Sequence, residues 1–508
     1  MHLWRTSCLA AIAVLVVAGC GNGTSGQSNG PPPHGNVLFY ATPGEPGSLD
    51  PGASISGFDQ YYTDSIYETL INSDSKTMQA TRPGLATGWS FTGADKLTFR
   101  LNLRHGVKFQ DGTPFNADAV KASLDHYKAA GAWFDLTPVK SETVVDDYTI
   151  DLNLSQQYSP LPAILSFRAG QIISPTALQK YGKDFGRHPV GAGPFSFVSW
   201  TAGSEIVLTR FKDYWNAAAT RLAGIDYKVI VDPTAMTNAM AAGQVDLSEL
   251  INLPVRNLAA LQGNSRVTTR VLNTLSLGIV TTVNTMPPFN NVLVRRAANL
   301  AIDRQALSDA IVGKGHGQGP AWQYVPPNYW AATTSLKDFG YHPDQAKELL
   351  RQAGYSNGVT VQICTFSDST TQAATIQKEQ MAPAGFNLQI SQEPVNSCVS
   401  KLQTGGIPMV EIGWFFLASP FQGYQTMFGA QASGPRYAGV DDLLARIASQ
   451  YTQPDQKPYY DQLNELLYQT APSVPTYWLV NPVAYSTRLT GLVTDINGGV
   501  RINQASFQ

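Results

Sequence analysis

The chain has 508 residues, of which 43% are apolar and 14% are charged, and its formal net charge is −2. This balance excludes a protein that binds nucleic acid through its phosphates, because such binding requires clustered cations. The apolar content also excludes an intrinsically disordered chain, and the length suggests roughly three domains at about 150 residues each. With 44 Gly and 32 Pro, the chain is expected to be rich in turns and loops.

The start of the chain has the pattern of an export signal. Arg5 precedes the apolar run Leu9–Ala18, which is too short to cross a bilayer core that needs about 20 residues. The run ends in Val-Ala-Gly-Cys20, which resembles the bacterial lipobox, where the cysteine is acylated before cleavage. We therefore predict a lipoprotein signal peptide over residues 1–19 and a lipid, such as palmitate, on Cys20. An ordinary signal peptide with a chance cysteine is the alternative.

Residues 20–36 are rich in Gly, Ser, Asn and Pro and have no hydrophobic period. This composition predicts a flexible tether. The mature protein is then expected at the cell membrane, anchored by its lipid and facing the extracytoplasmic side.

The chain has four cysteines. Cys8 leaves with the signal peptide and Cys20 carries the lipid, which leaves Cys364 and Cys398 as a pair in an oxidising compartment. We predict a disulfide between them, which would stabilise the fold by roughly 3 to 4 kcal/mol on the chain-entropy account. Two buried, unpaired thiols are the alternative.

Several elements of the body follow from hydrophobic periodicity. Alternating apolar residues predict strands over residues 97–103 and 225–231, and Asn116 is a suitable N-cap for the helix that follows it. Pro343 begins and Gly354 ends a predicted helix with apolar residues at i, i+3, i+4 and i+7.

A strand, a helix and a second strand are predicted over residues 359–363, 371–384 and 386–390. This order implies a right-handed crossover and a parallel strand pair. Cys364 and Cys398 lie at or beyond the carboxyl ends of these strands, which favours the disulfide. The body is therefore expected to be α/β and multi-lobed, and we find no internal repeat in the sequence.

The sequence contains no recognisable enzymatic signature. It has no GxSxG elbow and no HExxH, and no pair of its seven histidines has helical metal-ligand spacing. The Gly-rich segments 190–195 and 313–319 lack the residues that complete dinucleotide and phosphate motifs, so both are predicted to be loops. We predict no catalytic residue, no cofactor and no metal, and only a metal site assembled from distant loops remains open.

Aromatic residues are dense in three places. These clusters are Tyr61-Tyr62 with Tyr67, Trp414-Phe415-Phe416 with Phe421 and Tyr424, and Tyr477-Trp478. An aromatic surface between domains is a common way to hold a small ligand, although core packing is the better explanation for any single ring.

Motifs in a consistent order carry a family resemblance from about residue 37 to the end. The chain resembles the family 5 extracellular solute-binding proteins, the peptide and nickel class that serves ABC importers. The matching segments are Tyr67–Leu70, Pro83–Ala86, Leu97–Pro114, Pro189–Phe195 with Trp200, Asp213–Trp215, Ala242–Asp246, Pro288–Arg295, and Tyr341–Leu350 with Ala353–Tyr355.

The resemblance implies a periplasmic-binding-protein-like (venus flytrap) fold of two lobes, in the large cluster with an extra domain. It places domain I at 37–77, 190–280 and 481–508, domain II at 78–189 and domain III at 281–480. The lobes would close over a ligand by hinge motion.

The resemblance weakens at the positions that set specificity. In peptide-binding members a GWxxD stretch supplies an aspartate for the peptide's α-ammonium, whereas this chain has Leu417 there and Ser419 at the second acidic position. A desolvated ammonium without a counter-charge is unfavourable, so we predict a neutral or aromatic-compatible solute such as a blocked or modified peptide or a glycoside. Asn291 replaces a familial Asp that is expected to cap a helix, a task asparagine also performs.

The family position implies that Trp414 forms a stacking wall of the ligand site, with Phe415, Phe416 and Tyr424 beside it. Cluster density adds Tyr62 and Tyr477, and Asn284 is predicted to offer an amide near the lobe interface.

The predicted function is that of a monomeric substrate-binding lipoprotein of an ABC importer. It would capture a peptide-like or other small solute outside the membrane and deliver it to a permease and its ATPase. The alternative is an accessory envelope lipoprotein that keeps the fold but acts through protein contacts.

Overall fold

The structure is a computed structural model. It describes residues 35–53, 59–131, 136–249, 255–282, 286–414, 419–429 and 437–508. Asn36–Gln508 forms a compact unit. The predicted signal peptide and Cys20 lie outside the described residues.

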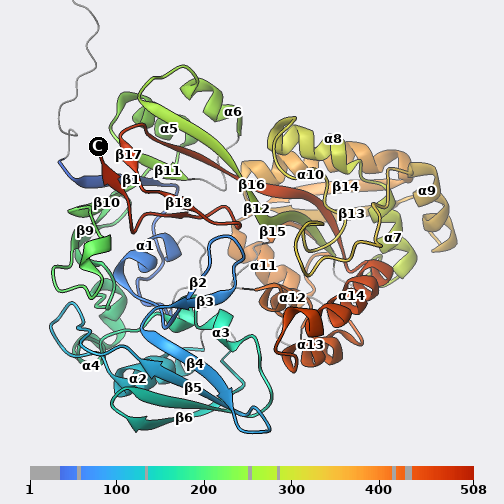
Figure 1. Cartoon of the computed structure of the whole chain (residues 1–508). Helices are drawn as coiled ribbons and strands as arrows, with labels where there is room; N and C mark the ends of the chain where they lie inside the picture. Colours follow the sequence, from blue (N-terminus) through green and yellow to red (C-terminus); the bar gives the residue numbers. More distant parts are fainter. Residues whose placement is uncertain are drawn as a thin grey trace, which may run out of the picture. The chain divides into compact units, whose positions relative to one another are not determined.

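A ten-stranded mixed sheet runs through the compact unit (Figure 1). Its strands, in spatial order, are β14 (Phe386–Gln392), β13 (Val359–Thr365), β15 (Met409–Trp414), β12 (Val267–Thr282), β16 (Ser473–Ser486), β11 (Leu247–Glu249), β1 (Val37–Thr42), β10 (Gly224–Val229), β9 (Glu205–Arg210) and β8 (Phe195–Thr201). In one half β1 is parallel to β10 and β11, and in the other β13 is parallel to β14 and β15.

Two long antiparallel strands, β12 and β16, join the halves. They contain 16 and 14 residues, and at about 3.3 Å per residue β12 spans roughly 50 Å. Their register shifts between Asn273 and Leu277, where the ladder is interrupted by a bulge. The predicted domain boundaries at 280 and 480 fall inside these two strands, and the division into three domains stays a prediction.

Helices cover both faces of the first half of the sheet. One face carries α1 (Asp59–Ile66), since the hydroxyls of Thr42 and Tyr62 lie 2.7 Å apart. The other face carries α5 (Pro233–Ala242), α6 (Val255–Leu258) and the 3-10 helix η4 (Ala259–Leu261). Ala41, which alternates with Tyr40 and Thr42 along β1, belongs to their apolar cluster. Successive side chains of β1 point to opposite faces of the sheet, so α1 and α6 lie on opposite faces.

A smaller antiparallel sheet has the order β4 (Ala86–Thr92), β5 (Thr98–Leu103), β7 (Thr149–Leu154) and β6 (Val139–Asp146), with α2 (Ala117–Ala129) packed beside it. The strand predicted at 97–103 is confirmed as β5, and the Asn116 side chain caps α2 by accepting from the Ala119 amide at 3.1 Å. The other elements around it are β2 (Ile71–Ser73), β3 (Ala80–Pro83), α3 (Leu161–Ile164), η1 (Arg168–Gly170), α4 (Pro175–Tyr181), η2 (Gly182–Arg187) and η3 (Ala217–Ala219).

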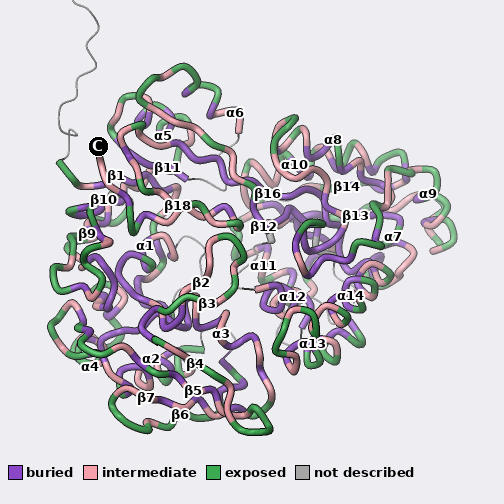
Figure 2. Tube along the Cα trace, viewed as in Figure 1, coloured by how far each residue is buried: buried purple, intermediate pink, exposed green. Residues whose placement is uncertain are grey.

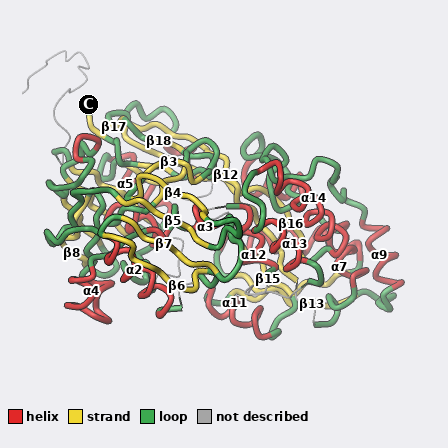
Figure 3. The backbone as a smooth tube through the Cα atoms, turned by 60° about the horizontal axis from the view of Figure 1, so that its bottom comes forward, coloured by secondary structure: helices red, strands yellow, loops and turns green. Residues whose placement is uncertain are grey.

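The second half of the sheet is also covered on both faces. The helices are α7 (Val292–Leu300), α8 (Arg304–Ser308), the π-helical turn η5 (Asp309–Gly313), α9 (Pro343–Gln352), α10 (Asp368–Met381), η6 (Ala382–Ala384), α11 (Val395–Thr404), α12 (Pro420–Phe428), α13 (Val440–Ala448) and α14 (Gln453–Thr470). Met409 of β15 belongs to the cluster of α7, α9 and α10, whereas Val410 packs with α11. Seen from a second side, α11 lies beside β15 (Figure 3).

The predicted strand, helix and strand of this half are confirmed as β13, α10 and the parallel strand β14. The helix begins earlier than predicted, because Ser367 forms a capping box with Thr370. The helix predicted from Pro343 is α9, and Asn291 caps α7 as expected.

The strand predicted over residues 225–231 is shorter in the structure. It is β10, which ends at Val229, and Val231 beyond it is 71% exposed.

The chain ends in two small hairpin-like pairings, β17 (Leu489–Thr490) with β20 (Ser506–Phe507) and β18 (Val493–Thr494) with β19 (Val500–Arg501). Figure 2 shows that buried residues follow the strands of the large sheet and that exposed residues lie mainly on loops and outer helices. Within the part of the chain that the structure describes, none of the helices has the length and hydropathy needed to span a bilayer.

Candidate functional site

The carboxyl ends of strands from both halves converge on the bulge. Glu249 ends β11 opposite Val483 of β16, and Trp414 ends β15 opposite Leu277 of β12. The two strands thus approach the interrupted stretch 274–276 from opposite sides. In open α/β sheets ligands bind outside the carboxyl ends of parallel strands, so we take this convergence as the candidate site.

Side chains, and not the sheet ladder, hold the bulge. The Thr274 hydroxyl donates to the Leu479 carbonyl at 2.7 Å, and the Leu275 amide donates to Asn497 Oδ1 at 3.1 Å. The Gln318 side chain donates to the Thr274 carbonyl at 2.6 Å. Buried backbone groups need such partners, and these are supplied by residues far away in sequence.

Glu249 links three elements at the end of β11. Its Oε1 accepts from the Tyr40 hydroxyl of β1, and its Oε2 accepts from the Asn481 amide of β16 at 3.1 Å. The same Asn481 nitrogen donates to the Gly498 carbonyl at 2.8 Å. Burial raises the pKa of the Glu249 carboxyl to about 8, so the group is mainly neutral at pH 7.

A second acid, Asp64, lies on α1. It is exposed, but desolvation by the surrounding protein still raises the pKa of its carboxyl to about 6. Gln171 donates to its Oδ1 at 2.8 Å. This bond ties α1 to the residue that follows η1.

Three of the predicted ligand residues are buried in the structure. Tyr62 is fully buried, and its hydroxyl also donates to the Gly44 carbonyl at 2.7 Å, which fixes the chain leaving β1. Tyr424 is 2% exposed and donates to Asn464. Tyr477 is 3% exposed, and its ring covers Gly278, where a Cβ would lie 2.5 Å from it. All three tyrosines therefore pack in the core, and a contact with ligand stays a prediction for each.

The rest of the predicted aromatic wall is not described. Trp414 is seen as the last backbone residue of β15, while its side chain, Phe415, Phe416, Leu417 and Asn284 lie outside the described residues. Sequence reasoning missed Glu249, Asn481 and Asp64, because no motif surrounds them and the contacts of Glu249 span 209 and 232 residues.

Cys364 and Cys398 form a disulfide, with their Cα atoms 5.7 Å apart. The bridge joins β13 to α11 within a small apolar cluster that includes Leu402 and Val410. It therefore fastens α11 to the strand ends of this half of the sheet.

Residues 78–189 also touch α13 and the residues that follow it. The Ser159 amide donates to the Ala448 carbonyl at 2.8 Å, and the rings of Phe91 and Tyr451 meet edge to face with centroids 4.8 Å apart. These contacts join residues of predicted domain II to residues of predicted domain III.

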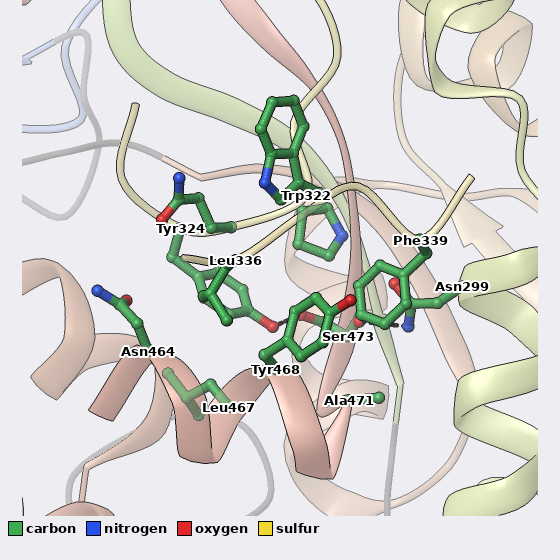
Figure 4. A pocket seen from close by; sticks show the side chains of 12 residues that line it. Asn299, Trp322, Tyr324, Leu336, Phe339, Asn464, Leu467, Tyr468, Ala471 and Ser473 are labelled. Atoms are coloured by element: carbon green, nitrogen blue, oxygen red, sulfur yellow. Dashed lines mark hydrogen bonds between the residues drawn. The ribbon is translucent and has the colours of Figure 1, made fainter. Parts of the chain in front are cut away.

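A crevice in the second half is too small for a solute (Figure 4). The rings of Phe339 and Tyr468 stack at 4.4 Å there, and the hydroxyls of Tyr324 and Ser473 lie 2.7 Å apart. Its volume of about 10 Å³ is close to the lower limit for one water molecule. Among the residues described, three or more His, Cys, Asp or Glu side chains nowhere form a group that could hold a metal ion.

Comparisons with known proteins agree with this architecture. The family model of bacterial extracellular solute-binding proteins, family 5 Middle, matches residues 80–435. The glutathione-binding protein GsiB of Escherichia coli O1:K1 is 28% identical over 486 residues, which cover 91% of this chain and 92% of the relative. GsiB of Salmonella choleraesuis is 29% identical over 467 residues, covering 87% and 89%.

Solved structures show the same fold. DppA from Helicobacter pylori in complex with peptide STSA has a TM-score of 0.83 at 24% identity, covering 93% of this chain and 98% of that one. NikZ from Campylobacter jejuni in complex with Ni(L-His) has a TM-score of 0.82 at 18% identity, covering 93% and 99%. The two-lobed periplasmic-binding-protein fold predicted from sequence is thereby confirmed.

Proposed function

The chain belongs to the family 5 bacterial extracellular solute-binding proteins, and from this premise we propose that it is the substrate-binding lipoprotein of an ABC importer. It captures a small solute outside the membrane, closes by rotation about β12 and β16, and passes the solute unchanged to a permease. The observation that supports this most is the convergence of β11 and β15 on the bulge between the two halves.

The proposed solute is peptide-like and lacks a free α-ammonium. Relatives named for glutathione and neighbours solved with STSA or Met-Leu support a peptide-like class. Leu417 replaces the acid expected to pair with an ammonium, so a blocked or modified N-terminus suits this chain better. In this proposal Trp414, Phe415 and Phe416 form the ligand wall, because they end or follow β15.

Calorimetric titration tests the solute class. The probes are glutathione, ordinary di- to pentapeptides and the same peptides with acetylated N-termini. We expect the acetylated peptides to bind more tightly than their free counterparts, since no buried ammonium then needs a partner. Tight binding that disappears on acetylation would contradict the proposed class. Recovery of a chemically altered probe would contradict the transport role itself.

The anchor is tested separately. In the proposal Cys20 carries the lipid, so Cys20→Ser should abolish labelling with a palmitate analogue and move the protein from the membrane to the soluble fraction. Cys8→Ser serves as the control and should leave both unchanged, because Cys8 lies within the predicted signal peptide. Labelling that survives in Cys20→Ser would show that the lipid lies elsewhere.

A further inference from the structure

Glu411 is a carboxyl group buried inside the second half of the sheet. It lies on β15, is 1% exposed, and pairs in register with Val280 of β12. Successive side chains of a strand alternate between faces, so Glu411 shares the face of Met409, which packs with α7, α9 and α10. The carboxyl therefore lies in the apolar layer between the sheet and α10.

One hydrogen bond joins this carboxyl to α10. Gln377 is fully buried on the inner face of that helix, and its Nε2 donates to Glu411 Oε2 at 2.9 Å. The other oxygen of each side chain, Oε1 of Glu411 and Oε1 of Gln377, accepts no hydrogen bond from any residue that the structure describes. Two buried acceptors without a donor are unfavourable, because each has given up its bonds to water.

The strands around Glu411 supply no counter-charge. The sequence of β13 contains no charged residue, and the single one on β12, Arg270, lies ten residues before Val280 on that strand. On β16, Tyr477 is the titratable residue that Glu411 affects. Burial, and after it the neighbouring Glu411, raises the pKa of the Tyr477 hydroxyl well above its usual range, so this ring stays neutral.

The helices of this half do not supply a counter-charge either. The charged residues of α10 are all exposed, namely Asp368, Lys378 and Glu379. Lys401 of α11 pairs with Glu393 at 2.6 Å, and α11 packs with Val410 on the other face of β15. Arg295 of α7 and Arg304 of α8 donate to backbone carbonyls of other segments.

Burial without an opposite charge raises the pKa of the Glu411 carboxyl to about 8, so the group is mainly neutral at pH 7. A neutral carboxyl has an O–H donor, which the carboxylate lacks. We propose that Glu411 is a carboxylic acid whose hydroxyl donates to Gln377 Oε1, so that a bound proton completes an acid–amide pair between β15 and α10 and its loss loosens this contact. One proton then provides for both unpaired oxygens.

The acid–amide pair goes beyond the proposed function, because it makes one half of the sheet sensitive to alkaline pH. Loss of the proton leaves a negative charge in an apolar layer, beside an amide oxygen that has no donor. The strand that carries Glu411 ends three residues later at Trp414, where the two halves converge. The contact between α10 and β15 therefore supports the strand that reaches the candidate site.

Infrared spectroscopy of the full chain tests the protonation state. At pH 6.5 we expect a carboxylic-acid C=O band that is missing in Glu411→Gln and present in Glu379→Gln, which changes an exposed residue of the same helix. Gln377→Met removes the amide, so the band should move to higher wavenumber as its hydrogen bond is lost. A carboxylate band that disappears in Glu411→Gln, or an acid band that Gln377→Met leaves unmoved, would overturn the proposal.

Urea unfolding measures the proton taken up on folding. The folded-state pKa of about 8 exceeds the ordinary value of 4.5, so between these values the folded chain binds the extra proton at this residue. Relative to Glu411→Gln, the unfolding equilibrium constant of the native protein should rise by up to about tenfold per pH unit between pH 5.5 and 7.5. Relative to Glu379→Gln it should not. A constant ratio between native protein and Glu411→Gln across this range would contradict the bound proton.

Hydrogen exchange locates the effect. After correction for intrinsic exchange rates, the amides of α10 and β15 should lose protection between pH 6.5 and pH 9 in the native protein and keep it in Glu411→Gln, with the amides of α2 as the internal reference. Equal losses in both proteins, or no loss in either, would show that the proton does not hold this contact. These measurements need no solute, so their failure would leave the proposed function unaffected.

Discussion

The side-chain amide of Asn481 on β16 donates to Oε2 of Glu249 at the end of the neighbouring strand β11, at 3.1 Å. Glu249 is 3% exposed and Asn481 is 2% exposed, so water does not replace this bond. The neutral form of the carboxyl is favoured there, because burial raises its pKa. Folding therefore takes up a proton at this position near neutral pH.

Glu249→Gln is expected to change how stability depends on pH. The folded-state pKa is about 8 against an ordinary value of 4.5, so between these values the folded chain binds more protons than the unfolded chain. Stability of the native protein should then fall as pH rises through this window, by at most about 1.4 kcal/mol per pH unit from this group. The neutral amide of glutamine replaces the neutral acid. The variant should therefore be as stable as the parent at pH 5 and more stable than the parent at pH 8.

Urea unfolding at pH 5, 6.5 and 8 measures this difference. Glu379→Gln, on the exposed face of α10, is the matched control and should show no comparable pH-dependent gain. A Glu249→Gln variant that loses stability at pH 8 would mean that the charged carboxylate is the form the fold requires.

Local signals explain which parts of the fold were predictable. Alternation identified β5, a capping asparagine identified the start of α2, and Pro343 marked the start of α9. Each depends on residues within one element. The order of β13, α10 and β14 then implied a parallel pair, because parallel strands need a crossover connection.

The candidate site was less predictable because its contacts are non-local. The bulge at 274–276 carries no glycine, and its partners Gln318 and Asn497 come from distant loops. Aromatic density indicated Tyr62, Tyr424 and Tyr477, but density cannot distinguish a ligand wall from a core. In the structure these three rings pack inside the protein.

Removing the disulfide should destabilise the protein without changing its fold. The bridge closes a loop with a sequence separation of 34, for which the chain-entropy account gives about 3 to 4 kcal/mol. Cys364→Ala with Cys398→Ala should lose this amount in urea unfolding, and dithiothreitol should weaken the native protein but not the variant. Equal stability of the parent with and without reductant would show that the bridge does not constrain the unfolded chain.

The contact between Phe91 and Tyr451 is expected to favour a closed arrangement of the two lobes over an open one. Their edge-to-face rings join predicted domains II and III at 4.8 Å, and such a pair contributes about 0.5 to 1.5 kcal/mol. Phe91→Ala should therefore weaken solute binding by about two- to tenfold and increase the radius of gyration in small-angle X-ray scattering. Tyr341→Ala removes an exposed ring far from this pair in sequence and serves as the control. An unchanged radius together with unchanged affinity would show that this contact does not influence closure.

Gly278→Ala tests how tightly β12 and β16 are packed against each other. An added Cβ would lie 2.5 Å from the Tyr477 ring, well inside van der Waals contact, so the ring or strand must move. Overpacking of this kind costs about 1 to 3 kcal/mol in the free energy of unfolding. Gly88→Ala on β4 is the control, since its Cβ would meet only the Asn102 side chain at 3.7 Å. If the ring is the obstacle, Tyr477→Ala should cost stability by itself, and adding Gly278→Ala to it should cost almost nothing more. Additive losses in this double-mutant cycle would instead place the strain in the backbone of β12.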